Sequence, residues 1–135
     1  MKRKILVVCL SNNRGGMEID TVSMCRRLAT YAQVTLLGVR GSPIEEMASE
    51  ASENGANFEF QVTKVNRFFA RSLVDLRLVL ALRAALKSII PDLVIFFGPS
   101  EIKSIGLAAI GLPVNVVLRM GTTLNKPKNG FFQRW

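Results

Sequence analysis

The sequence contains no histidine, only two cysteines, and a single tyrosine and a single tryptophan among its 135 residues. The lack of histidine removes the commonest general base and the commonest metal ligand, so any chemistry must come from carboxylates, hydroxyls, cations or backbone amides. Cys9 and Cys25 each lie in an apolar segment without metal-type spacing, which indicates reduced core residues of a cytosolic protein. We therefore expect no metal site and no bound cofactor.

Long hydrophobic runs are also missing. The basic N-terminus, Met1 to Lys4, precedes an apolar run that is too short for a secretory signal and ends in a polar loop. The apolar stretch at residues 73–90 is interrupted by four charged side chains, Asp75, Arg77, Arg83 and Lys87. The sequence therefore predicts no segment that spans a bilayer.

The composition fits one compact domain over residues 1–135, because 49% of the residues are hydrophobic and 21% are charged. Eighteen Lys and Arg against ten Asp and Glu give a net charge of +8, so anionic partners are expected. Phosphates and acidic lipid headgroups fit this charge. Nucleic acid is disfavoured, because the chain has no recognisable DNA- or RNA-binding motif and no evident aromatic stacking platform.

Continuous apolar runs alternate with helical patterns along the chain. The runs predict strands, the third near a sheet edge and the others buried, at residues 5–10, 34–39, 58–62, 93–97 and 114–118. Helical periodicity and capping residues predict helices at residues 17–31, 43–54, 72–90 and 101–110. Strands and helices that alternate at this spacing indicate a doubly wound α/β domain with a mainly parallel, Rossmann-like sheet and helices on both faces.

Ligands of such sheets bind at the carboxyl ends of the strands, which draws attention to the loop at residues 12–16 after the first strand. The loop lacks the third glycine of a dinucleotide fingerprint and the ending of a P-loop, so dinucleotides and triphosphates are disfavoured. Arg14, Gly15 and Gly16 leave a flexible backbone at a helix N-terminus, where free N–H groups can face an anion. An ordinary strand-to-helix turn is the alternative interpretation.

Two further groups are expected at the same edge. Glu18 lies in phase with Val22 and Cys25, so its side chain should lean toward the sheet, either for a functional role or simply to cap the helix dipole. Arg119, Gly121 and Thr122 leave the fifth strand at this edge and could contact a ligand. The alternative for Arg119 is an ion pair with a neighbouring carboxylate.

The third predicted helix carries leucines outside its core stripe, ringed by cations. Leucine and basic side chains on one face fit an acidic membrane surface, and the preceding loop has the same character. The residues expected to face a membrane are Phe68, Phe69, Arg71, Leu73, Leu76, Arg77, Leu80, Arg83 and Lys87. The alternative is a helix buried on two sides, against a neighbour or an absent domain.

Several short motifs in their order resemble the N-terminal domain of GT-B glycosyltransferases, of the family 4 type with a retaining mechanism. The first is Arg14-Gly15-Gly16-Met17-Glu18, which is similar to the Gly-Gly-x-Glu loop of that family. The others are Leu28-Ala29, Pro91-Asp92-Leu93-Val94, Gly106-Leu107-Ala108-Ala109 before Gly111-Leu112-Pro113-Val114, and Arg134-Trp135. The resemblance covers nearly the whole chain.

The resemblance implies one half of a two-domain enzyme. This chain would be the acceptor-side domain, and a C-terminal domain, absent from this chain, would bind the nucleotide-sugar donor. Together they would transfer the sugar to a lipid-linked, lipopolysaccharide-type or other glycan acceptor. The Gly15-Gly16 loop would lie close to the transferred group and its diphosphate, and the chain alone would be inactive.

The family often has a histidine after the fifth strand, where this chain has Met120-Gly121, so the resemblance assigns no catalytic residue here. It implies a cytoplasmic enzyme, peripheral on the inner leaflet of the membrane. An interpretation from a different class is a non-catalytic α/β module whose basic face binds acidic membranes or other polyanions.

Overall fold

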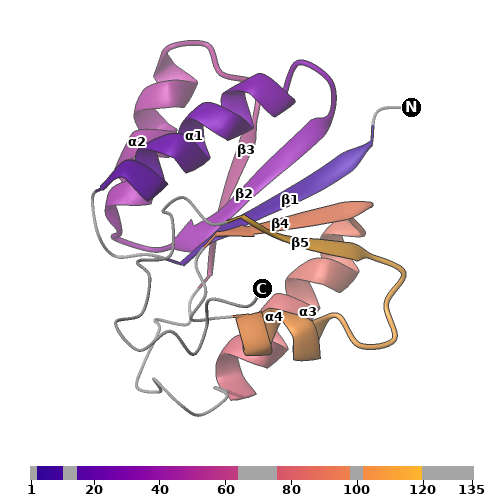
Figure 1. Cartoon of the computed structure of the whole chain (residues 1–135). Coiled ribbons are helices and arrows are strands. Elements are labelled where there is room, and N and C mark those ends of the chain that lie inside the picture. Colours follow the sequence, from indigo (N-terminus) through magenta and orange to yellow (C-terminus); the bar gives the residue numbers. More distant parts are fainter. Residues whose placement is uncertain (1–2, 11–14, 64–75, 98–101, 120–135) are drawn as a thin grey trace, which may run out of the picture.

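The computed structural model describes residues 3–10, 15–63, 76–97 and 102–119 (Figure 1). Five parallel strands form one sheet in the order β3-β2-β1-β4-β5. The strands are β1 (Lys4–Cys9), β2 (Gln33–Val39), β3 (Glu59–Thr63), β4 (Leu93–Phe97) and β5 (Asn115–Arg119). The helices are α1 (Gly16–Leu28), α2 (Pro43–Glu53), α3 (Leu76–Ile89) and α4 (Ile102–Ala108). The predicted doubly wound, Rossmann-like α/β domain is confirmed.

The helices form two layers, with α1 and α2 on one face of the sheet and α3 and α4 on the other (Figure 1). Alternate residues of β1 pack against the two helical layers, because successive side chains of a strand point to opposite faces of the sheet. Val7 and Cys9 pack with α1 and α2, whereas Leu6 and Val8 pack with α3 and α4. This two-sided burial explains why β1 appears in the sequence as a continuous apolar run.

The helix ends follow the local sequence signals closely. Pro43 occupies the first turn of α2, and Gly55 follows its end with a φ of +87°, a conformation that glycine adopts without strain. Ser42 is the N-cap residue of α2, but its Oγ donates to the Val39 carbonyl oxygen at 2.6 Å and makes no capping bond. The first residues of the predicted third helix, 72–75, and Ser100, the predicted cap of the fourth, lie outside the described residues.

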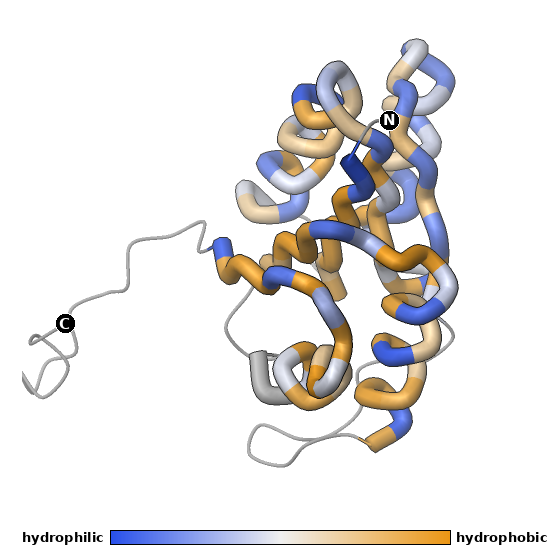
Figure 2. Tube along the Cα trace, turned by 90° about the vertical axis from the view of Figure 1, so that its right-hand side faces the viewer, coloured by the Kyte–Doolittle hydropathy of each residue, from blue (hydrophilic) through white to orange (hydrophobic). Residues whose placement is uncertain are grey.

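The fifth strand differs from its prediction as a buried strand. β5 lies at the edge of the sheet, with Val116 39% and Val117 48% exposed. Figure 2 faces this edge and shows β5 at the surface with apolar residues along it. The prediction of burial was wrong because an apolar run shows only that the side chains of a strand are suited to burial. Whether they are buried depends on the position of the strand in the sheet, and among the described residues β5 has a neighbouring strand on one side only. The third strand is confirmed as the opposite edge.

Within the described ranges, none of the helices has the length and apolar character needed to cross a membrane.

Candidate functional site

The carboxyl ends of β1 and β4 are neighbours at the centre of the sheet, where Cys9 and Phe97 are in register. From β1 the chain winds outward through β2 to β3, and it then returns to β4 on the other side of β1. Such a reversal of strand order opens a crevice between the loops that follow the two strands, and ligands of α/β sheets bind there. These loops are residues 11–14 and 98–101, so the predicted site residue Arg14 lies outside the described residues.

The first turn of α1 lies at this carboxyl edge of the sheet. Gly15 is the N-cap residue, and its backbone N–H donates to Glu18 Oε2 at 2.8 Å. The Glu18 side chain is 3% exposed, which confirms that it leans inward as its helical phase predicted. A Cβ at Gly15 would lie 3.2 Å from Glu18 Oε2, so the absence of a side chain leaves room for this bond. Glu18 therefore makes the capping contact, whereas Gly16 is exposed at the start of the helix.

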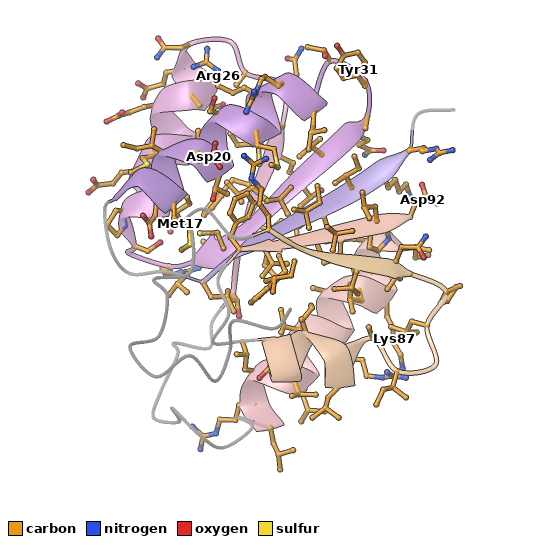
Figure 3. The ribbon with its side chains drawn as sticks, viewed as in Figure 1. Met17, Asp20, Arg26, Tyr31, Lys87 and Asp92 are labelled. Carbon is orange, nitrogen blue, oxygen red and sulfur yellow. The ribbon has the colours of Figure 1, made fainter. Side chains whose placement is uncertain are left out.

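Arg119 reaches the same edge from β5. Its Nη2 lies 3.0 Å from Asp20 Oδ2, and its guanidinium carbon lies 5.9 Å from the centroid of the Phe97 ring. Figure 3 shows Asp20 on α1, the helix that begins beside Gly15. The ion pair therefore joins the end of β5 to the beginning of α1 across the end of β4. The side chains are 42% and 32% exposed, so the pair contributes about 1 kcal/mol of stability or less.

The structure thus gathers Gly15, Gly16, Glu18 and Arg119 at one edge of a parallel sheet, as the sequence predicted. Gly121 and Thr122 lie outside the described residues. Sequence reasoning foresaw a carboxylate partner for Arg119 without naming Asp20. Asp20 comes two residues after Glu18, so its side chain points to a different side of α1. Only the strand order shows that this side faces β5.

The face of α3 also agrees in part with its prediction. Leu76 and Leu80 are 71% and 67% exposed, whereas Leu78, Leu82 and Leu86 form the buried stripe. Arg77 and Lys87 are exposed as well. Phe68, Phe69, Arg71 and Leu73, the other apolar and basic residues expected on this face, lie outside the described residues.

Arg83 has a contact that the sequence did not reveal. Its Nη1 donates to the carbonyl oxygens of Ala108 at 3.1 Å and Ile110 at 2.7 Å, just where α4 ends. A cation at this position satisfies carbonyl groups that have no partner within the helix. Arg83 therefore holds α3 and α4 together, and its substitution would perturb the fold as well as the charge of the face.

Both cysteines are free and buried, as expected from the sequence. Burial and, to a lesser extent, the nearby Cys9 together raise the pKa of the Cys25 thiol from 9.0 to about 12. Such a thiol stays protonated at neutral pH and is a poor nucleophile. Within the part of the chain that the structure describes, no cluster of His, Cys, Asp and Glu side chains could hold a metal ion.

No protein family model and no curated protein matches the sequence. Solved structures do match. MurG of Acinetobacter baumannii, a GT-B enzyme, aligns with a TM-score of 0.64 and 16% identity over 89% of this chain and 35% of MurG. A glycosyltransferase of Rickettsia africae aligns with a TM-score of 0.71 and 17% identity over 94% of this chain and 32% of that protein.

A third match is the C-terminal domain of the PF1911 hydrogenase of Pyrococcus furiosus, with a TM-score of 0.57 and 17% identity over 86% of this chain and 90% of that domain. At identities of 16% and 17%, these likenesses establish a shared fold and nothing finer. The chain spans 35% and 32% of the first two matches, about a third of each. The chain therefore has a Rossmann-like α/β fold, which it shares with part of two glycosyltransferases and with the hydrogenase domain.

Proposed function

We propose that this chain is the acceptor-side domain of a glycosyltransferase. The observation that carries the proposal is the sheet order β3-β2-β1-β4-β5, superposable on part of two glycosyltransferases, together with a cation and a helix N-terminus at its carboxyl edge. The enzyme transfers a sugar from a nucleoside-diphosphate sugar to a lipid-linked, lipopolysaccharide-type or other glycan acceptor. A separate donor-binding domain forms the other wall of the active site. The proposal also includes that the enzyme is of the family 4 type and retains the configuration of the transferred sugar.

The described edge has features that suit a diphosphate. The N–H groups of the first turn of α1 are aligned with the positive end of the helix dipole, and Gly16 is exposed there. Arg119 supplies a guanidinium, which binds phosphate oxygens in a forked geometry. Its pair with Asp20 is partly exposed and weak, so a phosphate can replace the carboxylate at little cost. Glu18, whose Oε2 accepts from the Gly15 N–H, holds the start of the helix in place.

To test this proposal, the chain is combined with a nucleotide-sugar-binding domain. The domain is either fused to it, using the coding sequence downstream of residue 135, or added as a separate protein. Release of nucleoside diphosphate from a panel of nucleotide sugars is then measured with glycan and lipid-linked acceptors. We expect turnover that neither half gives alone, with at least about a tenfold loss, or about 1.4 kcal/mol, for Arg119→Gln. Arg26→Gln, an exposed arginine in the last turn of α1, is the matched control and should retain activity.

A result in which no donor domain yields transfer in either arrangement contradicts the proposal. If the Arg119 and Arg26 variants lose activity equally, the chain is still part of a transferase, but Arg119 does not bind the diphosphate.

A second function is favoured by two exposed leucines of α3, Leu76 and Leu80, that lie one turn apart among basic side chains. We propose that Leu76 and Leu80 enter the headgroup region of the anionic inner leaflet, with Arg77 and Lys87 beside them, so that the protein is peripheral on the cytoplasmic side. Such docking suits a lipid-linked acceptor, and it also suits a non-catalytic module that only binds membranes.

Sedimentation with vesicles tests this docking. We expect binding that requires anionic lipid and weakens with salt, and at least a tenfold lower partition coefficient for Leu76→Ser/Leu80→Ser, since burial of one leucine contributes about 1.5–3 kcal/mol. The control, Ile19→Ser/Tyr31→Ser, removes two exposed large side chains on the other side of the sheet, one on α1 and one in the turn between α1 and β2. Arg83 is left intact because it holds the end of α4. Equal loss in both variants would refute docking through α3.

A further inference from the structure

A polar cavity of about 200 Å³ lies at the amino ends of the strands. It is formed by the first residues of β1, β2 and β3, which are neighbours in the sheet, and by the last turn of α3. Gly16 and Arg119 belong to the opposite, carboxyl edge, so this cavity is separate from the candidate site described above. Six polar side chains line it: Lys4, Gln33, Thr35, Glu59, Gln61 and Ser88.

Thr35 is the most deeply buried of the six, with 5% of its surface exposed. It lies on the face of β2 that carries Leu37 and Val39, both of which pack in the core under α3. The residue beside it on β1 is Leu6, which is fully buried. A valine would suit such a position, because strands with covered faces are rich in branched apolar side chains. The chain instead buries a hydroxyl group here.

Within the ranges that the structure describes, no protein group forms a hydrogen bond with the Thr35 hydroxyl. Other buried hydroxyls do have a partner: Thr21 Oγ1 donates to the Met17 carbonyl oxygen at 2.7 Å, and Ser42 Oγ donates to that of Val39 at 2.6 Å. A buried hydroxyl without a hydrogen bond destabilises a fold, and such groups are rare in native proteins. Because Thr35 lines the cavity, a molecule bound there would supply the missing partner.

The lining of the cavity indicates the class of this molecule. The ammonium group of Lys4 is balanced by the carboxylate of Glu59, so the cavity suits a neutral ligand although the chain as a whole is basic. Gln61 Nε2 donates to Glu59 Oε1 at 3.3 Å, which sets an amide and a carboxylate side by side. Together they offer adjacent donors and acceptors, which match neighbouring hydroxyl groups. The volume of about 200 Å³ is below the roughly 300–1,000 Å³ of pockets for drug-sized ligands, so one small ring fits.

We propose that this cavity binds one neutral sugar unit. The sugar hydroxyl groups form hydrogen bonds with the amide of Gln61 and the carboxylate of Glu59, and one of them pairs with the Thr35 hydroxyl. Lys4 and Gln33 offer further donors at the exposed side of the cavity. A bound sugar thus satisfies the buried hydroxyl, whereas the free protein is less stable than it would be with an apolar residue there. The proposal does not depend on the proposed function, because a domain without transferase activity would bind the sugar in the same way.

The test uses nuclear magnetic resonance of the native, isotope-labelled 135-residue chain. The chain is titrated with glucose, galactose, mannose and N-acetylglucosamine, each as the free sugar and as its methyl glycoside. We expect at least one of them to give saturable shifts of the backbone amides of Thr35, Glu59 and Gln61. Tighter binding of the glycoside means that the site takes a unit of a glycan chain, and tighter binding of the free sugar means that it takes a monosaccharide. Glycine and inorganic phosphate are titrated in the same way, to test for a site that binds charged ligands instead.

Thr35→Val separates binding from structure, because valine keeps the shape of the side chain and removes the hydroxyl. We expect about fivefold weaker sugar binding, as for the loss of one hydrogen bond, and a higher melting temperature of the free protein. Thr21→Val is the matched control, because Thr21 is also buried but its hydroxyl donates to the Met17 carbonyl oxygen on the other side of the sheet. It should leave sugar binding unchanged. Should Thr35→Val fail to fold, Gln61→Met removes the amide at a partly buried position and should weaken sugar binding to a similar extent.

The proposal is overturned if none of the sugars gives saturable shifts at these amides, or if glycine or phosphate does so while the sugars do not. It is also overturned if Thr35→Val and Thr21→Val weaken sugar binding equally. A lower melting temperature of free Thr35→Val with unchanged sugar binding would likewise overturn it, since the hydroxyl would then have a structural role only.

Discussion

Replacing Phe96 by alanine is expected to lower the free energy of unfolding by about 3–5 kcal/mol. Phe96 is fully buried in β4 and lies in register between Val8 of β1 and Leu118 of β5. Its ring belongs to the core cluster that joins the sheet to α3 and α4, and its removal leaves a cavity that a parallel sheet cannot easily close. Because small domains are stabilised by only about 5–15 kcal/mol, urea denaturation should show a large shift of the midpoint.

Val116→Ala is the control for this experiment. Val116 points to the same face of the sheet as Phe96 but is 39% exposed at the edge, so its truncation should cost less than about 1 kcal/mol. Similar losses in the two variants would mean that β5 is covered as well as β4, which contradicts its assignment as an exposed edge.

The stability of the protein is expected to fall steeply between pH 9 and pH 12 because of Cys25. Burial raises the pKa of this thiol from 9.0 to about 12, so the folded chain keeps the proton that the unfolded chain releases. The unfolded state then binds fewer protons, and the free energy of unfolding decreases as the pH rises through this interval. The loss amounts to at most about 4 kcal/mol, and the contribution is complete below pH 9.

Cys25→Ala isolates this effect from every other pH-dependent change in the chain. Urea denaturation of both proteins at several pH values should show a stability difference that shrinks or reverses between pH 9 and pH 12, because only the parent chain loses the thiol contribution. A constant difference across that range would mean that Cys25 ionises at its ordinary pKa and is accessible to water in the folded chain.

Much of the candidate site followed from local rules. The inward direction of Glu18 follows from helical periodicity alone, because the residues in phase with it, Val22 and Cys25, are apolar. The common edge for Gly15 and Arg119 follows from strands that all run in one direction. The partners of two arginines could not be identified from the sequence, which offered for Arg119 only a neighbouring carboxylate as one alternative and nothing for Arg83. Arg119 meets Asp20, 99 positions earlier in the chain, and Arg83 meets carbonyl groups beyond the end of another helix.

The sequence by itself determined where the strands and helices of this protein lie along the chain, because hydrophobic periodicity and helix-end signals such as Pro43 and Gly55 act over a few residues. Only the tertiary structure decided that β5 is an exposed edge and that Arg119 joins β5 to α1. These features depend on which strands become neighbours. Strand order is settled by the packing of the whole sheet, and no short stretch of the chain encodes it.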